Sequence, residues 1–237
     1  MQELDRLLAL ADPDQAQRMA AYHKAPRLYL GIGNATIELL VREWRAERDL
    51  AHRVALAAQL WQSDIHEARI AAARLLTQAR IPDDGEVWRL IRHWTDDFDG
   101  PAITDHVMIA GQKRLVADPS RLDDIQPWLQ DANIWKRRAV LTGTLPWARM
   151  NHPHPEDLAR RERILGWAAS LADQPDWCIQ KAIATWLHAL SKRDTFRVRA
   201  FLDEYGAKMQ PFARREAARH LNAQGTMRPN KPAPSST

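Results

Sequence analysis

The stretch SDIHEARIAAARLL, residues 63–76, indicates the fold class because its apolar side chains recur every three or four residues, as on one face of an α-helix. It has an acidic residue near its start and a small alanine at its centre, where a neighbouring helix can approach closely. Two later stretches share this arrangement, QDANIWKRRAVLTG at 130–143 and DQPDWCIQKAIATWL at 173–187. The central alanines of the three stretches are Ala71, Ala139 and Ala182.

The spacing of these alanines favours a repeat array over a globular helix bundle. Ala139 and Ala182 are 43 residues apart, the period of HEAT repeats, and the 68 residues from Ala71 to Ala139 leave room for one irregular repeat. In such an array each helix pair packs on its neighbours, and one helix of each pair lines a concave surface. We predict an all-α fold, a right-handed curved solenoid of HEAT-like antiparallel helix pairs. It would form a single domain over residues 1–224, followed by a disordered, proline-rich tail at 225–237.

Helical spacing extends along the rest of the chain, and short breaks rich in Pro, Asp and Gly separate the helices. The predicted helices cover residues 2–11, 14–23, 34–46, 49–62, 64–80, 85–94, 101–116, 119–130, 132–145, 155–171, 176–191, 194–204 and 209–222. Short links between them predict antiparallel neighbours.

The composition limits the class of protein. A hydrophobic content of 45% over 237 residues predicts a folded chain with a substantial core. One cysteine, Cys178, excludes an internal disulfide framework and a cysteine-rich zinc site, and it suits the reducing cytoplasm. The amphipathic N-terminus is unlike a secretory signal, and no apolar run approaches the roughly 18 residues of a membrane span. We expect a cytoplasmic monomer that does not enter a membrane.

Positive charge is concentrated in the second half of the chain. Residues 1–131 contain 16 Lys and Arg against 21 Asp and Glu, whereas residues 132–237 contain 18 against 9. An uneven but solvated surface would explain this polarity, and so would an anionic partner. Basic residues recur beside the central alanines, which favours the phosphates of a nucleic acid. They are Lys136, Arg137, Arg138 and Lys181, followed by Lys192, Arg193, Arg214, Arg215 and Arg219.

The ten tryptophans are mostly expected in the core, because a Trp at helical spacing is more often a packing residue than part of a ligand site. Trp94 and Trp186 are the two that we consider as cleft-lining residues. The nine histidines have no metal-ligand spacing, and neither a glycine-rich phosphate loop nor a Ser-His-Asp set stands out.

From Met19 to Leu221 the chain resembles the AlkD-like DNA alkylation-repair glycosylases, which are HEAT-like-repeat proteins. The resemblance rests on motifs that occur in the same order. They are MAAYHKAPRLYLGIG (19–33), LWQSDIHEARIAAARLL (60–76), HWTDDFDG (93–100), DANIWKRRAV (131–140), WCIQKAI (177–183) and FARREAARHL (212–221).

The resemblance implies an enzyme that excises cationic alkylated purines, such as 3-methyladenine and 7-methylguanine, from duplex DNA without a metal or other cofactor. A cationic purine is already a good leaving group, and breaking its glycosidic bond develops positive charge on the sugar. One fixed carboxylate near that centre stabilises the charge. The family motif places this carboxylate at Asp99, with Asp96 and Asp97 as its acidic neighbours.

The resemblance also implies contacts with the DNA backbone. Arg138 corresponds to the Arg that grips the backbone beside the lesion, with Arg137 and Lys136 as further phosphate contacts. Tyr22 corresponds to an N-terminal Tyr that touches the backbone, and His188 takes the place of an Arg. Further matching basic positions are Lys181, Lys192, Arg214 and Arg215.

Two departures from the family pattern affect the cleft. Thr95 and Thr185 stand where the family has tryptophans that contact the sugar, and Trp94 and Trp186 are their immediate neighbours. A more open cleft would accept bulkier adducts. The alternative is a non-catalytic relative that binds DNA of unusual shape, with Asp99 kept as a helix cap before Gly100 and Pro101. A scaffold for protein partners is disfavoured because its concave face would be apolar.

Overall fold

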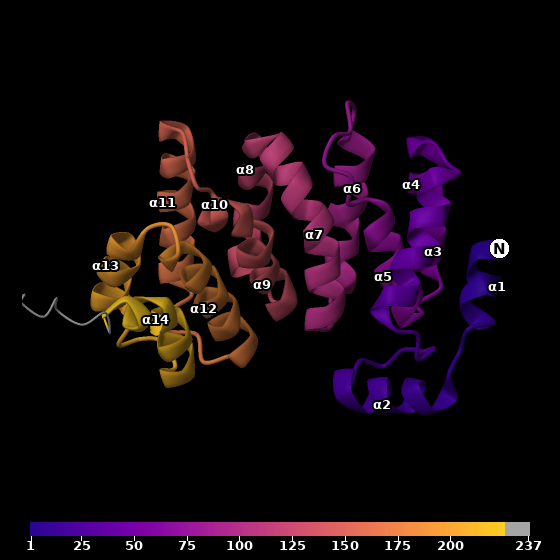
Figure 1. The fold of residues 1–237 in the computed structure, drawn as a ribbon, viewed down its shortest axis with the longest axis horizontal. Coiled ribbons are helices and arrows are strands. Elements are labelled where there is room, and N and C mark those ends of the chain that lie inside the picture. Colours follow the sequence, from indigo (N-terminus) through magenta and orange to yellow (C-terminus); the bar gives the residue numbers. More distant parts are fainter. Residues whose placement is uncertain (226–237) are drawn as a thin grey trace, which may run out of the picture. The chain divides into compact units, whose positions relative to one another are not determined.

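The computed structural model describes residues 1–225, and its regular structure is helical (Figure 1). The β-type pairing in this part of the chain is one isolated parallel bridge between Leu28 and Ile65. The predicted all-α class is therefore confirmed. Contacts gather into two compact units, Met1–Pro146 and Trp147–Thr237. No described helix has both the length and the apolar character that crossing a membrane requires.

The first unit contains most of the helices. They are α1 (Gln2–Leu8), α2 (Pro13–His23), α3 (Asn34–Ala46), α4 (Leu50–Gln62), α5 (His66–Leu75), α6 (Gly85–Trp94), α7 (Pro101–Ala117), α8 (Leu122–Ile125) and α9 (Ile134–Gly143). Short 3-10 turns follow α6, α7 and α8. They are η1 (Thr95–Asp97), η2 (Pro119–Arg121) and η3 (Gln126–Gln130). The bounds of α3 and α6 are those predicted from the sequence.

Helix α5 is central to the packing of the first unit. It contacts α3, α4 and α7, and α7 in turn packs on α9 (Figure 1). The alanines of α5 allow these close approaches, since Ala68, Ala71, Ala72 and Ala73 are all 0% exposed. Ala139 of α9 is also fully buried. The small residues that suggested a helical repeat are therefore core residues at helix contacts.

Prolines and glycines explain where the predicted helix bounds differ from the structure. The predicted helix at 119–130 is divided into η2, α8 and η3. Helix α8 ends at Ile125, two residues before Pro127, which lacks the amide proton that would continue the helical hydrogen bonds. The predicted helix at 132–145 ends at Gly143, and a short α10 (Leu145–Arg149) follows. The predicted helix at 64–80 begins at His66 and ends at Leu75.

The second unit consists of α11 (Pro155–Ser170), α12 (Trp177–Ser191), α13 (Thr195–Tyr205) and α14 (Pro211–Gly225). Helix α12 packs against both α13 and α14. Its core side includes Ala182, which is 3% exposed, and Trp186, which is 0% exposed. The predicted single domain over residues 1–224 stays a prediction. Apart from Gly225, the predicted tail at 225–237 lies outside the described residues.

Candidate functional site

The loop at residues 24–33 is tied to α5 by one buried carboxylate. Glu67 is 0% exposed and accepts hydrogen bonds from three successive backbone amides at distances from 2.8 to 3.3 Å. The donors are Leu30, Gly31 and Ile32. Gly31 has a φ of +80°, and a Cβ atom there would lie 2.3 Å from the carbonyl oxygen of Asp12. Only glycine fits this position, so the close approach of the loop to Asp12 depends on Gly31.

Asp99 lies between η1 and α7, and its carboxylate contacts this loop. Its Oδ2 accepts a hydrogen bond from Nη2 of Arg27, a side chain that is only 3% exposed. Its Oδ1 has no hydrogen-bond partner among the described residues. The side chain of Asp99 as a whole is 31% exposed. The loop therefore supplies a buried cation that holds one oxygen of a partly exposed carboxylate.

The residue that caps α7 is Gly100, and no side chain bonds to the first amides of that helix. The prediction that Asp99 caps α7 is therefore wrong, while the non-catalytic alternative does not depend on that cap. Thr104 donates its hydroxyl proton to the carbonyl oxygen of Gly100 at 2.8 Å, which closes the turn from within the helix. Capping therefore uses neither oxygen of Asp99.

The segment on either side of Asp99 is anchored by aromatic and polar contacts. Trp94 stacks on Trp61 with ring centroids 4.3 Å apart and planes within 9° of parallel. The indole Nε1 of Trp61 donates to Asp97 at 2.7 Å. The side-chain amide of Asn133 donates to the carbonyl oxygen of Phe98 at 2.8 Å. These contacts fix the backbone immediately before Asp99.

The basic residues at the start of α9 are already engaged with acidic or carbonyl groups. Arg138 is 7% exposed and donates to the carboxylate of Asp105 through Nε at 3.0 Å and Nη2 at 2.8 Å. Two parallel hydrogen bonds of this kind fix the orientation of the guanidinium group. Arg137 donates to the carbonyl oxygen of Asp131 at 2.8 Å.

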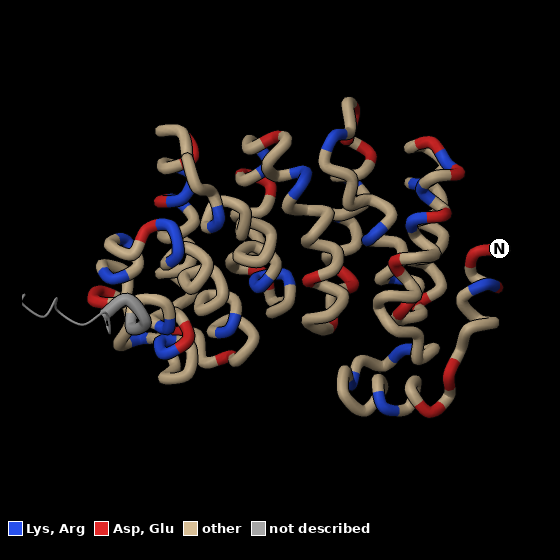
Figure 2. Tube along the Cα trace, viewed as in Figure 1, with Lys and Arg blue, Asp and Glu red and all other residues tan. Residues whose placement is uncertain are grey.

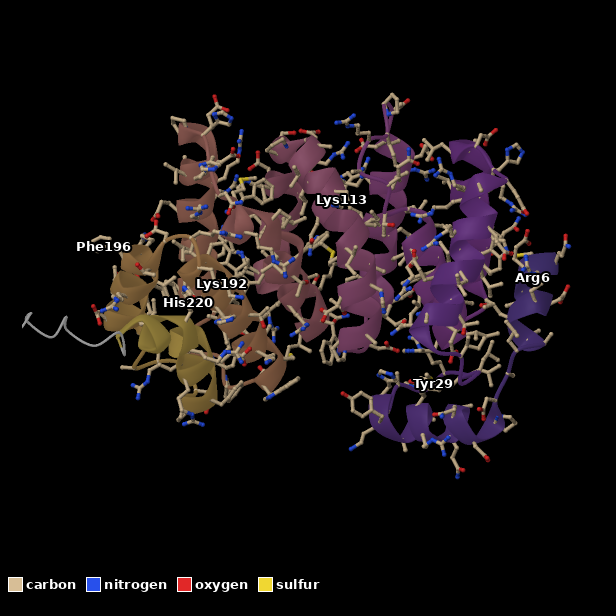
Figure 3. The ribbon with its side chains drawn as sticks, in the orientation of Figure 1. Arg6, Tyr29, Lys113, Lys192, Phe196 and His220 are labelled. Carbon is tan, nitrogen blue, oxygen red and sulfur yellow. The ribbon has the colours of Figure 1, made fainter. Side chains whose placement is uncertain are left out.

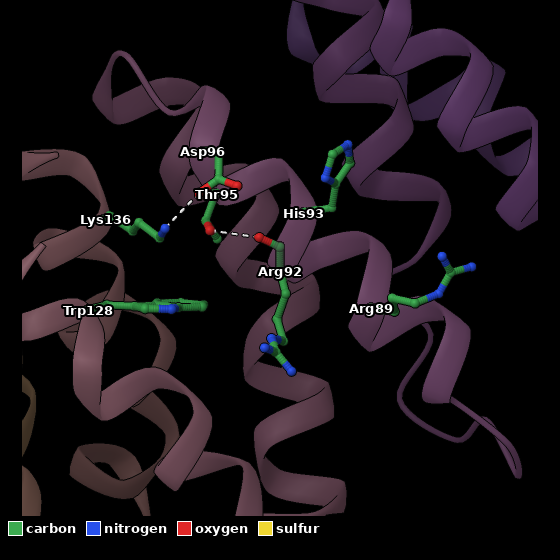
Figure 4. Close-up of a pocket in the computed structure, with 7 residues that line it drawn as sticks. All are labelled: Arg89, Arg92, His93, Thr95, Asp96, Trp128 and Lys136. Carbon is green, nitrogen blue, oxygen red and sulfur yellow. Dashed lines mark hydrogen bonds and ion pairs between the residues drawn. The ribbon is translucent and has the colours of Figure 1, made fainter.

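Lys136 borders a cavity of about 380 Å³ in the first unit (Figure 4). The lining residues are Arg89, Arg92, His93, Thr95, Asp96, Trp128 and Lys136. Lys136 pairs with Asp96 at 2.7 Å and with Asp131 at 3.2 Å. Burial lowers the pKa of Lys136, but these two carboxylates outweigh burial and the net shift is upward. Asp99 does not line this cavity.

The four residues predicted to line a cleft lie in two different kinds of environment. Trp94 and Trp186 are 1% and 0% exposed, which corrects the prediction for both, because their indole rings belong to the core. Thr95 borders the cavity of Figure 4, and its hydroxyl donates to the carbonyl oxygen of Arg92 at 2.7 Å. Thr185 borders a second cavity, in the second unit.

Tyr22 lies at the end of α2 with 80% of its surface exposed. Its ring meets His23 edge-on, with centroids 5.0 Å apart. Behind this pair the ring of His66 lies 4.6 Å from His23 and 4.8 Å from Tyr29, which is labelled in Figure 3. Burial, followed by the nearby His23, Arg27 and His106, lowers the pKa of His66 to about 3.

We expect this shift to make the protein less stable as the pH falls. Between pH 6.5 and about 3 the unfolded chain binds a proton at His66 that the folded chain does not bind. The free energy of unfolding therefore decreases by up to about 1.4 kcal/mol per pH unit from this ring alone. Urea unfolding at pH 7 and pH 5 should show a loss in the native protein about 2 kcal/mol larger than in His66→Phe.

The exposed Phe196 supplies the control for this measurement, because it is 80% exposed and carries no titratable group. Phe196→Leu should keep the native pH dependence. Equal losses in the native protein and His66→Phe would show that His66 is not held neutral.

The second unit carries the remaining basic residues that the sequence predicted for DNA binding, and Lys and Arg recur on α12 and α14 (Figure 2). Lys181 pairs with both oxygens of Glu216, at 2.8 and 2.7 Å. Arg219 donates to Nε2 of His188 at 3.2 Å. Three further side chains are exposed: Lys192, Arg214 and Arg215. In the described part of the chain, no group of three or more His, Cys, Asp or Glu is arranged to hold a metal ion.

The family model described as DNA alkylation repair enzyme matches residues 4–221 of this chain. The chain belongs to the DNA alkylation repair enzyme family. The AlkD-like resemblance predicted from the sequence is therefore confirmed. No curated protein matches the chain.

Solved structures share the fold of this DNA alkylation repair family member at low sequence identity. A predicted DNA alkylation repair enzyme from Enterococcus faecalis is 19% identical, with a TM-score of 0.74 over 89% of this chain and 96% of that one. AlkD2 from Streptococcus mutans is 17% identical, with a TM-score of 0.59 over 88% and 96%. The protein smu.31 from Streptococcus mutans UA159 is 18% identical, with a TM-score of 0.61 over 86% and 98%.

Sequence reasoning missed two residues of the site in this family member, Arg27 and Glu67. Arg27 stands alone among apolar neighbours in APRLYL, whereas Glu67 lies on α5 beside His66 and near Arg69. A charged residue within an apolar run is the signal that was available for Arg27, because such a residue is buried only when it is paired. The sequence around Glu67 gives no such signal. The pattern does not reveal the partners, which are 72 and about 36 residues away.

Proposed function

We propose that this protein is a DNA glycosylase that hydrolyses the N-glycosidic bond of cationic N-alkylated purines in duplex DNA. The substrates would be 3-methyladenine, 7-methylguanine or bulkier adducts. The observation that carries the proposal is the carboxylate of Asp99, which Arg27 holds through Oδ2 while Oδ1 has no protein partner among the described residues. Membership of the DNA alkylation repair enzyme family supports it.

The proposed reaction requires only modest help from the protein. The bond between C1′ and the purine nitrogen breaks, the electron pair leaves with the base, and the base becomes neutral. Positive charge develops on the sugar, and the fixed negative charge of Asp99 would stabilise it. Water would then attack C1′ and lose a proton to the solvent. Oδ1 of Asp99 is a buried atom, so the proposed role of Asp99 rests on its charge.

The basic residues would bind the DNA backbone. Lys136, Arg137 and Arg138 lie together at the start of α9, and Asn133 links this region to the Asp99 segment. Tyr22 and the basic residues of the second unit would add further backbone contacts. These basic residues are Lys181, His188, Lys192, Arg214 and Arg215. The antiparallel helix pairs are proposed to form the HEAT-like right-handed solenoid predicted from the sequence.

A non-catalytic relative that recognises unusual or damaged DNA is the second candidate, and one observation favours it. Arg27 places a positive charge directly against Asp99, which reduces the negative field available to a cationic sugar. The threonines at 95 and 185 and the buried indoles beside them remove the aromatic contacts expected of the family.

Base release from a duplex that contains 7-methylguanine distinguishes the two functions. A glycosylase should release the free base at least about tenfold faster than the same duplex loses it in buffer. A non-catalytic relative should show no added release but should bind the duplex with an affinity that falls steeply with salt. In either case Arg138→Ala should weaken binding about tenfold and lower the salt slope by about 1. A protein that does not bind duplex DNA at low salt would contradict both.

A further inference from the structure

The second unit contains a cavity whose charges differ from those of the cavity in Figure 4. Its volume is about 260 Å³, and it lies between the end of α10 and the C-terminal end of α12. The side chains around it include Arg149, His188, Lys192 and Arg193, with Thr185 between them. No carboxylate borders it. A site with this lining attracts anions and repels cations.

The cations of this cavity are not neutralised by neighbouring acids. Among the described residues, Arg149, Lys192 and Arg193 form no ion pair. Two acids of this unit pair with other cations instead, Glu162 with Arg197 and Glu216 with Lys181. In the cavity of Figure 4, by contrast, the basic side chains of the lining pair with acids. The pairs are Arg89 with Glu86, Arg92 with Asp124 and Lys136 with Asp96.

His188 also lines this cavity, and its ring carries a nitrogen without a protein partner among the described residues. Its Nε2 accepts from Arg219, which is always a donor, so the neutral ring carries its proton on Nδ1. That Nδ1 is buried and has no hydrogen-bond partner among the described residues. Burial, followed by the charges of Arg219 and Lys192, lowers the pKa of His188. Lys192 and His220, two neighbours of His188, are both labelled in Figure 3.

We propose that this cavity is a binding site for a phosphomonoester, such as the terminal phosphate of a DNA strand. Three unpaired cations suit a group that carries close to two negative charges, whereas each phosphodiester of an intact backbone carries one. Arginine forks and a neutral imidazole N–H are the donors that bind phosphate oxygens well. The cavity is smaller than typical small-molecule sites of about 300–1,000 Å³, so it suits an end group better than a whole nucleotide.

Two duplexes that differ only at a nick test whether the ligand is the end of a DNA strand. Each duplex has one nick, which carries a 5′-phosphate in one duplex and a 5′-hydroxyl in the other. Binding of the full-length protein to each duplex would be followed by fluorescence anisotropy. We expect the phosphorylated nick to bind about tenfold tighter. This preference should disappear in the double variant Arg149→Gln, Arg193→Gln. It should persist in Arg199→Gln, which removes an exposed charge from α13 of the same unit.

Inorganic phosphate tests whether the cavity binds free phosphate in the absence of DNA. In one outcome, calorimetry shows that inorganic phosphate binds to the native protein but not to the double variant, while the two nicked duplexes bind equally. That result would support the phosphomonoester site and identify free phosphate, rather than a DNA strand end, as its ligand. Equal affinity for both nicks together with no binding of inorganic phosphate would overturn the proposal, since only backbone contacts would remain. Neither arm measures base release, so this result and that of the glycosylase proposal are independent.

Discussion

Asp99→Asn should reduce the rate of 7-methylguanine release by about 100-fold or more, to near the background in buffer. The asparagine keeps the shape of the side chain and an oxygen that Arg27 can bond, but it loses the negative charge. Removing one group that stabilises charge in a transition state typically costs about 100- to 1,000-fold in rate. Single-turnover release at saturating protein isolates the chemical step from DNA binding, and duplex affinity should change little.

Asp96→Asn is the matched control, because it removes a carboxylate three residues away that is 69% exposed and pairs with Lys136. Its single-turnover rate should stay within about threefold of the native rate. Equal losses in the two variants would mean that only the general negative charge of this segment matters. Undiminished release by Asp99→Asn would remove Asp99 from the mechanism.

Glu67→Ala should lower the free energy of unfolding of the first unit by about 3–5 kcal/mol. The substitution leaves three backbone amides without their acceptor, and a buried donor that loses its partner costs about 1–3 kcal/mol. Because the three amides are adjacent, the loop will relax and recover part of this cost. Urea unfolding followed by tryptophan fluorescence measures the effect.

Glu43→Ala is the control for this stability measurement. Glu43 is a carboxylate of the same unit that pairs with Arg6, but it is 53% exposed, and exposed pairs contribute at most about 1 kcal/mol. If Glu67→Ala unfolded within about 0.5 kcal/mol of the native protein, the loop would not depend on this carboxylate.

Local patterns predicted much of the helical structure. Helices α3 and α6 have the predicted bounds, because apolar spacing and the start and stop signals agree there. The prediction was wrong at 119–130, where the apolar spacing continued across Pro127 but the hydrogen-bond ladder did not. Periodicity identifies the side of a helix that packs, whereas helix bounds depend on local backbone chemistry.

The candidate site was predictable only in part. The family motif led to Asp99 and to the basic residues of α9, but not to Arg27, whose contact with Asp99 spans 72 residues of sequence. The environment of Trp94 was also predicted wrongly. We expected both Trp94 and Thr95 to line a cleft, but only Thr95 borders a cavity, whereas Trp94 is 1% exposed and stacks on Trp61 in the core. Pairings across the fold depend on packing that a single sequence does not record.

The contact between the loop at 24–33 and Asp99 means that the site is built from two separate segments of the chain. Asp99 precedes a core helix, while its cationic neighbour belongs to an N-terminal segment whose attachment depends on Glu67 and on the close fit of Gly31. The local charge at Asp99 can therefore be retuned in evolution, or by grafting a different segment, while the helical core stays unchanged. The N-terminal segment can therefore change the charge at the site without a change in the helices that form the core.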